Sequence, residues 1–231
     1  MSVTLTAPPG YTTKPAEYFG CDRTEMLSFV PSHCRRVLDV GCGAGAFGEL
    51  LKKTRKVEVW GIEPVGSAAA KASSKLDHVV NRSFDSGSEL PCGMFDCIVF
   101  NDVLEHMIFP EQALQYAKSL LAEGGVVVAS IPNIRSLVTL FHLLFRAQWE
   151  YTDSGVLDKT HLRFFTKSSI VDMFEREGYA LEEICGINLQ RDCVSGRLWA
   201  AYAVANALSL GKFTDLRFLQ FAVVAKPVSL R

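Results

Sequence analysis

One short run of this chain, VLDVGCGAGAFG from Val37 to Gly48, constrains the fold more than any other feature. An apolar segment typical of a β-strand contains an acid, Asp39, and is followed at once by closely spaced glycines. Glycines allow the backbone to turn tightly and to approach a ligand, and the first turn of a following helix has unpaired N–H groups. The run therefore predicts an α/β sheet with a nucleotide-type pocket at the carboxyl end of its first strand.

Strand-like and helix-like segments alternate around this run. Strands are expected at 37–40, 57–62, 78–81, 95–100 and 126–131, and helices at 46–53, 67–76 and 110–121. This alternation predicts a parallel sheet with helices on both faces. A further helix at 167–177 and two more strands, at 181–187 and 218–225, are expected nearer the C-terminus.

The length of 231 residues suits one domain with insertions. Residues 1–17 are rich in Thr and Pro and predict a flexible tail, and Asp22 and Glu25 have the spacing of a capping box before a short helix. Residues 18–231 are expected to form one domain. Its alternation breaks at about 134–166 and again at 189–215, where a helical insertion is expected. Such insertions commonly determine substrate specificity.

Composition excludes several classes of protein. The net charge is −1 and no basic stripe is present, which argues against a nucleic-acid partner. The seven cysteines are scattered and odd in number, which argues against a disulfide framework and favours the reducing cytoplasm. The N-terminal residues do not resemble a signal peptide, and no apolar run reaches the ~18–20 residues that span a bilayer. These features predict a cytoplasmic protein.

The glycine run permits two interpretations. Gly43, Gly45 and Gly48 match the GxGxxG fingerprint of dinucleotide-binding dehydrogenases, with Glu63 about twenty residues further on. Asp39, however, lies two residues before the first glycine and gives the pocket an acidic floor, where a pyrophosphate needs neutral space. An acid there suits a ligand that has an ammonium and a sulfonium and no phosphate, which favours S-adenosylmethionine over a dinucleotide.

A second run, FDCIVFNDVLEHM from Phe95 to Met107, places polar residues just past a buried strand, at the same sheet edge as the glycines. The motifs VLDVGCGAG, GIEP, FDCIVFNDVLEHM and GGVVVASIPN, in this order, resemble class I S-adenosylmethionine-dependent methyltransferases over roughly residues 18–179. The resemblance implies a Rossmann-like α/β fold, with a seven-stranded, mostly parallel sheet whose last strand is antiparallel. It also implies S-adenosylmethionine as the cofactor.

The same resemblance implies a set of cofactor contacts. Asp39, Gly41 and Gly43 would line the methionine part, and Glu63 would accept both ribose hydroxyls. Phe84 and Asp85 would lie near the adenine, although the segment SFDSGSELP departs from the commoner Gly-Asp pattern. The full set of expected cofactor contacts is Asp39, Gly41, Cys42, Gly43, Glu63, Phe84, Asp85, Asn101, Asp102 and Val103.

A longer pattern begins with Tyr18-Phe19 and Arg23-x-Glu25-Met26-Leu27 and continues through Ser130–Asn133 and Trp149–Thr166. It is similar to a bacterial subgroup associated with polysaccharide and glycan modification, which implies O-methylation of a sugar hydroxyl. A sugar hydroxyl is a poor nucleophile and gains from a base, commonly a histidine. The expected catalytic residues are His161 as the base, with His106 or Asp158 beside it, and the expected acceptor contacts are Tyr151 and Arg163. Alternatively, Asp158, Thr160, His161 and Arg163 only hold this loop onto the core.

Ubiquinone-pathway O-methyltransferases are more distantly similar to the chain. This similarity implies an alternative acceptor, a quinone or another small hydroxylated metabolite. These enzymes also contain acid-x-x-acid-His runs that are linked to a metal. Asp102, Glu105 and His106 would share one helix face and could hold a divalent ion. Glu105 and His106 also occur as helix-anchoring groups in metal-independent relatives, so no metal is expected.

The apolar segments at 137–145 and 199–210 would cover the active site or make peripheral contact with a membrane. The expected partner is a small-molecule or glycan acceptor. A cofactor-binding module without catalysis remains a third alternative.

Overall fold

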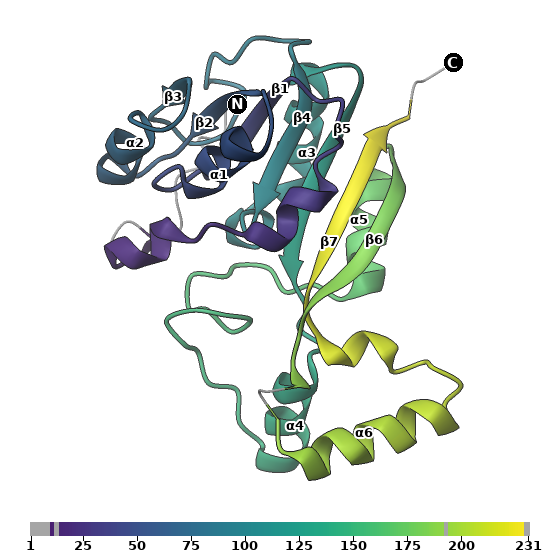
Figure 1. The fold of residues 1–231 in the computed structure, drawn as a ribbon. Coiled ribbons are helices and arrows are strands. Elements are labelled where there is room, and N and C mark those ends of the chain that lie inside the picture. The colour runs from purple at the N-terminus through teal and green to yellow at the C-terminus, as the bar shows by residue number, and fades with distance from the viewer. Residues whose placement is uncertain (1–9, 12–13, 192–193, 229–231) are drawn as a thin grey trace.

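A computed structural model of the chain describes residues 10–11, 14–191 and 194–228. Its centre is a sheet with the strand order β3-β2-β1-β4-β5-β7-β6, and only β7 runs antiparallel to its neighbours (Figure 1). The strands are β1 (Arg36–Val40), β2 (Glu58–Ile62), β3 (His78–Val80), β4 (Phe95–Asn101), β5 (Leu121–Pro132), β6 (Tyr179–Leu189) and β7 (Phe218–Pro227). The predicted seven-stranded, mostly parallel sheet is confirmed.

Helices cover both faces of the sheet because its central strands are apolar on both sides. One face packs against α1 (Ala46–Thr54), α2 (Gly66–Ala72) and the 3-10 helix η3 (Thr24–Phe29). The other packs against α3 (Pro110–Leu120) and α5 (Lys167–Arg176). Neighbouring residues of β1 serve opposite cores, Val37 on the first face and Leu38 on the second. Strands that are buried on both faces are continuous apolar runs in the sequence, and such runs are easily recognised as strands.

Two further helices lie at the end of the sheet, away from the helices that cover its faces (Figure 1). Helix α4 (Leu137–Arg146) follows β5, and α6 (Gly196–Leu208) lies between β6 and β7, where a helical insertion is predicted. They share a small apolar cluster with Leu137, Tyr202 and Leu216 buried at its centre. The segment between α4 and α5 returns to the sheet through a bridge from Asn133 to Phe165.

The N-terminal region differs from expectation in two respects. The predicted capping box is wrong: η3 follows Arg23, which is in the left-handed conformation, and no side chain caps this helix. Glu25 instead forms an ion pair with Arg23 at 3.3 Å. Within the expected flexible tail, the described residues Tyr11 and Lys14 are packed rather than loose, because Lys14 is paired with a buried acid and Tyr11 with neighbouring rings.

Candidate functional site

The loop between β1 and α1 needs its glycines for two physical reasons. Gly41, Gly43 and Gly45 have φ values of +67°, +52° and +76°, a region that side chains rarely adopt. A Cβ on Gly43 would also lie 2.6 Å from the carbonyl oxygen of Phe19, and one on Gly41 would lie 2.8 Å from Val103. Phe19 accepts a hydrogen bond from the Ala44 N–H at 2.8 Å, so the N-terminal segment lies directly on this loop.

A cavity of about 450 Å³ opens beside this loop, a volume usual for small-molecule sites. It lies where β1 and β4, adjacent and parallel in the sheet, both end. The predicted cofactor contacts that line it are Asp39, Gly41, Cys42, Gly43, Asn101 and Asp102. The structure therefore brings together two sequence motifs that are some sixty residues apart along the chain.

Two of these residues have buried side-chain polar atoms without a hydrogen-bond partner. Asp39 is only 2 % exposed, and its Oδ2 has no hydrogen-bond partner; neither side-chain polar atom of Asn101 has one. Burial, together with the carboxyl group of Glu63, raises the pKa of Asp39 to about 8. Each unsatisfied buried polar group costs roughly 1–3 kcal/mol. A ligand with an ammonium and hydroxyl or amide groups would satisfy them, and S-adenosylmethionine has these groups.

Glu63 lies behind the loop rather than in the lining of the cavity. Its buried carboxylate accepts hydrogen bonds from the N–H groups of Gly43 at 3.0 Å and Val65 at 2.8 Å. Glu63 thus connects the glycine loop to the start of α2. Each carboxylate oxygen has a second lone pair, so the role of Glu63 toward a ribose stays a prediction.

The structure does not bring the other three predicted cofactor residues to the cavity wall. Phe84 is buried in the core against Phe100 and Tyr116. Asp85 accepts a hydrogen bond from the Gly87 N–H at 2.8 Å within its own turn. Val103 packs behind Gly41. Their contacts to the adenosine part stay predictions.

Arg23 is a site residue to which sequence reasoning assigned no role. Its guanidinium contacts the Asp102 carboxylate at 2.6 Å and donates to Ser130 Oγ at 2.9 Å and Gln220 Oε1 at 3.1 Å. Asp102 also accepts from Ser130 and Gln220. The network ties η3 to β4, β5 and β7. The only sequence signal for Arg23 is its place in the N-terminal stretch ahead of the glycine run.

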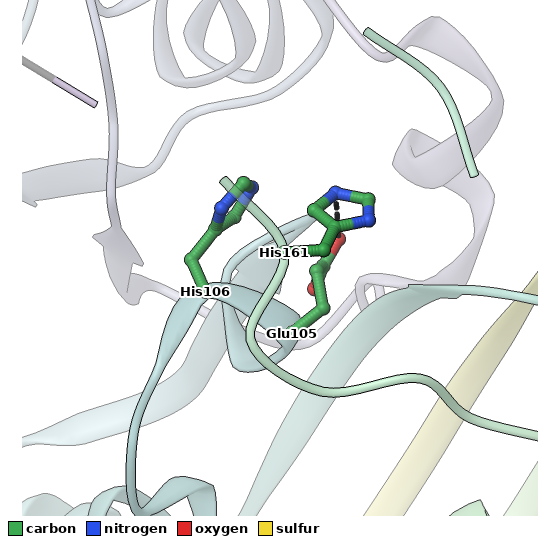
Figure 2. Close-up of side chains that lie close together, drawn as sticks. All are labelled: Glu105, His106 and His161. Atoms are coloured by element: carbon green, nitrogen blue, oxygen red, sulfur yellow. Dashed lines mark ion pairs between the residues drawn. The ribbon is translucent and has the colours of Figure 1, made fainter. Parts of the chain in front are cut away.

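A cluster of three titratable side chains lies at the other end of the cavity. Glu105 and His106 come from the turn after β4, and His161 comes from the loop between α4 and α5 (Figure 2). One potential ligand atom from each residue lies within 4.8 Å of the others, and His161 Nε2 is 3.9 Å from Glu105 Oε1. The cluster differs from the expected Asp102, Glu105 and His106 set, because Arg23 holds Asp102 away and His161 joins instead.

The two histidines differ in what their ring nitrogens contact. His106 Nδ1 lies 3.1 Å from the Thr160 carbonyl, and its Nε2 lies 3.2 Å from the Tyr18 hydroxyl. Both nitrogens are therefore engaged. Burial lowers the pKa of His106 to about 4, the neighbouring His161 adding to the effect. His106, predicted to be catalytic, thus has the contacts of a positioning group. It links the loop at Thr160 to the N-terminal segment at Tyr18.

Among the described residues, one ring nitrogen of His161 makes no hydrogen bond, although it lies 3.9 Å from Glu105 Oε1. Its Nδ1 lies 3.1 Å from the Val156 carbonyl oxygen, which can only accept, so Nδ1 carries the proton and Nε2 has a lone pair. Burial lowers the pKa of His161, which favours the neutral ring. His161 also lines the cavity. These properties are those of a general base.

Glu105 is buried below this ring, and neither of its carboxylate oxygens has a hydrogen-bond partner. Burial raises its pKa well above the usual range, and the charge on Asp102 adds to the shift. Burial therefore favours the uncharged carboxyl form of Glu105. The same three side chains have the donor types that bind a divalent cation.

Asp158, the third predicted catalytic residue, is engaged elsewhere. Its carboxylate pairs with Lys14 at 2.5 Å and accepts from the N–H and hydroxyl of Thr160 at 2.8 and 2.7 Å. Its contact with His161 is through backbone atoms only. Asp158 therefore fits the alternative interpretation, in which it holds the loop on the core. The sequence carries no local signal for Lys14, which lies 144 residues away.

The two predicted acceptor contacts lie outside the cavity wall. Tyr151 is 55 % exposed and packs near Trp149 and Phe164, while Arg163 donates to the Ile108 carbonyl. The cavity wall also includes aromatic rings from the N-terminal segment. These rings belong to Tyr11, Tyr18 and Phe19, which meet edge to face at 5.5–6.0 Å.

Comparisons with known proteins agree with this geometry. The chain is 26% identical over 195 residues to a ubiquinone biosynthesis O-methyltransferase of Aeromonas salmonicida, covering 80% of this chain and 74% of that protein. It is 26% identical to the human mitochondrial enzyme of the same name over 71% of this chain and 48% of that protein.

Solved structures show the same fold. An S-adenosylmethionine-dependent methyltransferase of Archaeoglobus fulgidus superposes with a TM-score of 0.63 at 21% identity, over 94% of this chain and 96% of that one. Another, from Aquifex aeolicus, superposes with a TM-score of 0.59 at 18% identity, over 93% and 94%. A family model described as "Methyltransferase domain" matches residues 14–184, well over half of the chain. The chain therefore belongs to this methyltransferase family, and it is an S-adenosylmethionine-dependent enzyme.

Proposed function

We propose that the enzyme methylates a hydroxyl oxygen of a small hydroxylated metabolite of the quinone or phenol type. His161 supports this proposal most directly, since it lines the same cavity as Asp39 and Asn101 and its Nε2 has no hydrogen bond to the described residues. The relatives named as ubiquinone biosynthesis O-methyltransferases support the acceptor class. The aromatic lining formed by Tyr11, Tyr18 and Phe19 suits a flat apolar ring.

Different residues of the cavity would bind the cofactor and act on the acceptor. S-adenosylmethionine, when bound, supplies an electrophilic methyl group on its sulfonium. Asp39 and Asn101 would hold its polar groups. His161 Nε2 would take the proton of the acceptor hydroxyl as the methyl carbon gains a bond to that oxygen and loses its bond to the sulfonium sulfur, which would leave as a neutral thioether. Tyr11 and Phe19 would exclude water and fix the two reactants relative to one another.

The lowered pKa of His161 bears on the choice between a sugar and a phenol. A base with a pKa below the ordinary 6.5 takes protons poorly from weakly acidic hydroxyls. A phenolic hydroxyl, with a pKa near 10, is much closer to it than a sugar hydroxyl. The similarity of residues 149–166 to a glycan-modifying subgroup remains a prediction from sequence, and neither relative described above has a name that refers to glycans.

The acceptor class can be tested directly with labelled cofactor. Methyl transfer from S-adenosylmethionine would be measured to catechol-type phenols and, in parallel, to a panel of hexoses and glycans. We expect transfer to phenols, with rates that rise across the panel as the hydroxyl becomes more acidic. Transfer to sugars without transfer to phenols would reject the proposal and restore the glycan interpretation.

A further inference from the structure

The cavity extends along the edge of the sheet beyond the ends of β1 and β4. Its wall also includes Pro132 at the end of β5, Gln220 near the start of β7 and Asn188 near the end of β6. In the sheet register Gln220 pairs with Pro132 on one side and with Ile187 on the other. These strand ends therefore form one continuous part of the wall, and β5 places it next to β4.

Five polar side chains form a closed ring of hydrogen bonds and ion pairs at this part of the wall, which we call the polar ring. Its members, in order, are Arg23, Asp102, Gln220, Asn188 and Glu25, and neighbouring members lie 2.6–3.3 Å apart. All except Glu25 line the cavity. Asp102 and Asn188 have φ values of +55° and +57°, a conformation that side chains rarely adopt and that is concentrated at functional sites.

The partners within the polar ring fix the orientation of both amides. Arg23 can only donate and a carboxylate can only accept, so the Gln220 oxygen faces Arg23 and its nitrogen faces Asp102. The Asn188 nitrogen donates to Glu25 and to the Gln220 oxygen, which uses both of its hydrogens. Within the described chain, Asn188 Oδ1 accepts no hydrogen bond and the Gln220 nitrogen keeps one hydrogen. The polar ring can therefore offer one acceptor and one donor to a ligand in the cavity.

Charge restricts the ligand further. Arg23 is the only Lys or Arg among the described residues that line the cavity. Its guanidinium already contacts two carboxylates, Asp102 at 2.6 Å and Glu25 at 3.3 Å. The described wall thus has no unpaired Lys or Arg for the carboxylate of a ligand, and a carboxylate has no hydrogen to donate to the Asn188 oxygen. A neutral hydroxyl or carboxamide can both donate and accept, which matches the polar ring.

We propose that the polar ring is the acceptor-recognition subsite of the cavity, which binds a neutral polar substituent of the aromatic acceptor and rejects an acceptor with a carboxylate. This inference rests on the proposed function, methyl transfer to a phenol, and adds the charge of the substituent. The loop that contains His161 returns to the same strand end, where Phe165 bridges to Asn133, the residue after β5. A flat acceptor would therefore present its reacting hydroxyl to His161 and another substituent to the polar ring.

Three catechols that differ in one substituent test the proposal: 4-methylcatechol, 3,4-dihydroxybenzamide and 3,4-dihydroxybenzoate. Their affinities would be measured by calorimetry with S-adenosylhomocysteine present, and methyl transfer to each would be measured in parallel. We expect the benzamide to bind about ten-fold more tightly than the benzoate, which is ionised at neutral pH, and several-fold more tightly than methylcatechol. Because binding needs no turnover, selective binding without methyl transfer would count against the proposed function and not against the polar ring.

Two variants connect this selectivity to the polar ring. Asn188→Gly removes the side chain at a φ that glycine adopts easily, and should weaken binding of the benzamide about five-fold with little effect on methylcatechol. Glu25→Gln removes one of the two charges that neutralise Arg23, and should reduce the preference for the benzamide over the benzoate about five-fold. The dissociation constant of S-adenosylmethionine should stay within about two-fold in both variants, which shows that they are folded.

Two matched controls lie outside the described cavity wall. Leu210→Gly removes an exposed side chain at a φ of +55°, and Glu111→Gln removes an exposed carboxylate of α3. Neither should alter the preference among the three catechols. The proposal is overturned if the benzoate binds as tightly as the benzamide, if none of the three compounds binds, or if Asn188→Gly and Glu25→Gln behave like these controls.

Discussion

The two ends of the cavity are built in different ways. The cofactor end is formed by the ends of adjacent strands, where the register places Asp39 beside Val99 and Val40 beside Phe100. The acceptor end joins three segments that are distant in sequence, and its contacts link Tyr18 to His106 and Lys14 to Asp158. Sheet topology fixes the first end, whereas individual side-chain pairs fix the second. The two ends should therefore respond differently to substitution.

The largest effect is expected from breaking the acceptor end at its buried ion pair. Lys14→Met leaves the Asp158 carboxylate buried without its cation, which should lower the free energy of unfolding by about 3 kcal/mol or more. Urea denaturation measures this loss. The double variant Lys14→Met/Asp158→Asn has no uncompensated charge and keeps an acceptor for Thr160, so it should recover at least half of the loss. Equal stability of both variants would show that the pair does not hold this end together.

The next effect is expected at the glycine loop. Gly43→Ala places a methyl group against the Phe19 carbonyl at a positive φ, and should weaken S-adenosylmethionine binding more than ~100-fold in calorimetry. Gly93→Ala is the matched control, because Gly93 also has a positive φ but nothing within 4 Å of its Cβ position. It should cost roughly 1–2 kcal/mol of stability and leave cofactor affinity unchanged. Similar affinities for the two variants would contradict the close approach at Gly43.

A smaller effect on the same end is expected from charge alone. Asp39→Asn should weaken cofactor binding by about 10- to 150-fold, the value of one hydrogen bond to a charged group. Because the pKa of Asp39 is about 8 in the free protein, the cofactor must displace a proton below that pH. Wild-type affinity should therefore rise by up to about ten-fold per pH unit as the pH approaches 8.

The asparagine variant has no carboxyl group to ionise, so its affinity should change much less over this pH range. Asp85 lies outside the cavity wall, so Asp85→Asn should alter the affinity for S-adenosylmethionine less than two-fold. A larger loss would support the contact to the adenine that the sequence predicts. A wild-type affinity that does not depend on pH would argue against Asp39 as the group that meets the ammonium.

The smallest effect is expected at Glu105. If its raised pKa keeps it neutral, Glu105→Gln replaces one uncharged group by another of similar shape, and turnover should stay within about three-fold. Removing divalent metals with a chelator should then have little effect as well. A loss of turnover above ten-fold in this variant, together with sensitivity to the chelator, would show that the cluster of Glu105, His106 and His161 works as a metal site.

The sequence predicts most of the sheet and much of the cofactor end, for a physical reason. Buried parallel strands and glycine turns are local features, so Val37–Val40 and Gly41–Gly43 can be recognised from neighbouring residues. The acceptor end depends on long-range pairs, and nothing near Lys14 or Arg23 in sequence indicates the acids that they contact. For the same reason Tyr151 and Arg163, predicted from a motif, lie outside the cavity wall.

The most direct test of the whole account is the His161→Ala variant. The account places His161 at the acceptor end only, as the base. The dissociation constant of S-adenosylmethionine should therefore stay within about two-fold of the wild type, while the single-turnover rate of methyl transfer to a phenol falls by about 10²–10⁴-fold. An unchanged transfer rate, or a loss of cofactor binding as large as the loss of rate, would contradict the account.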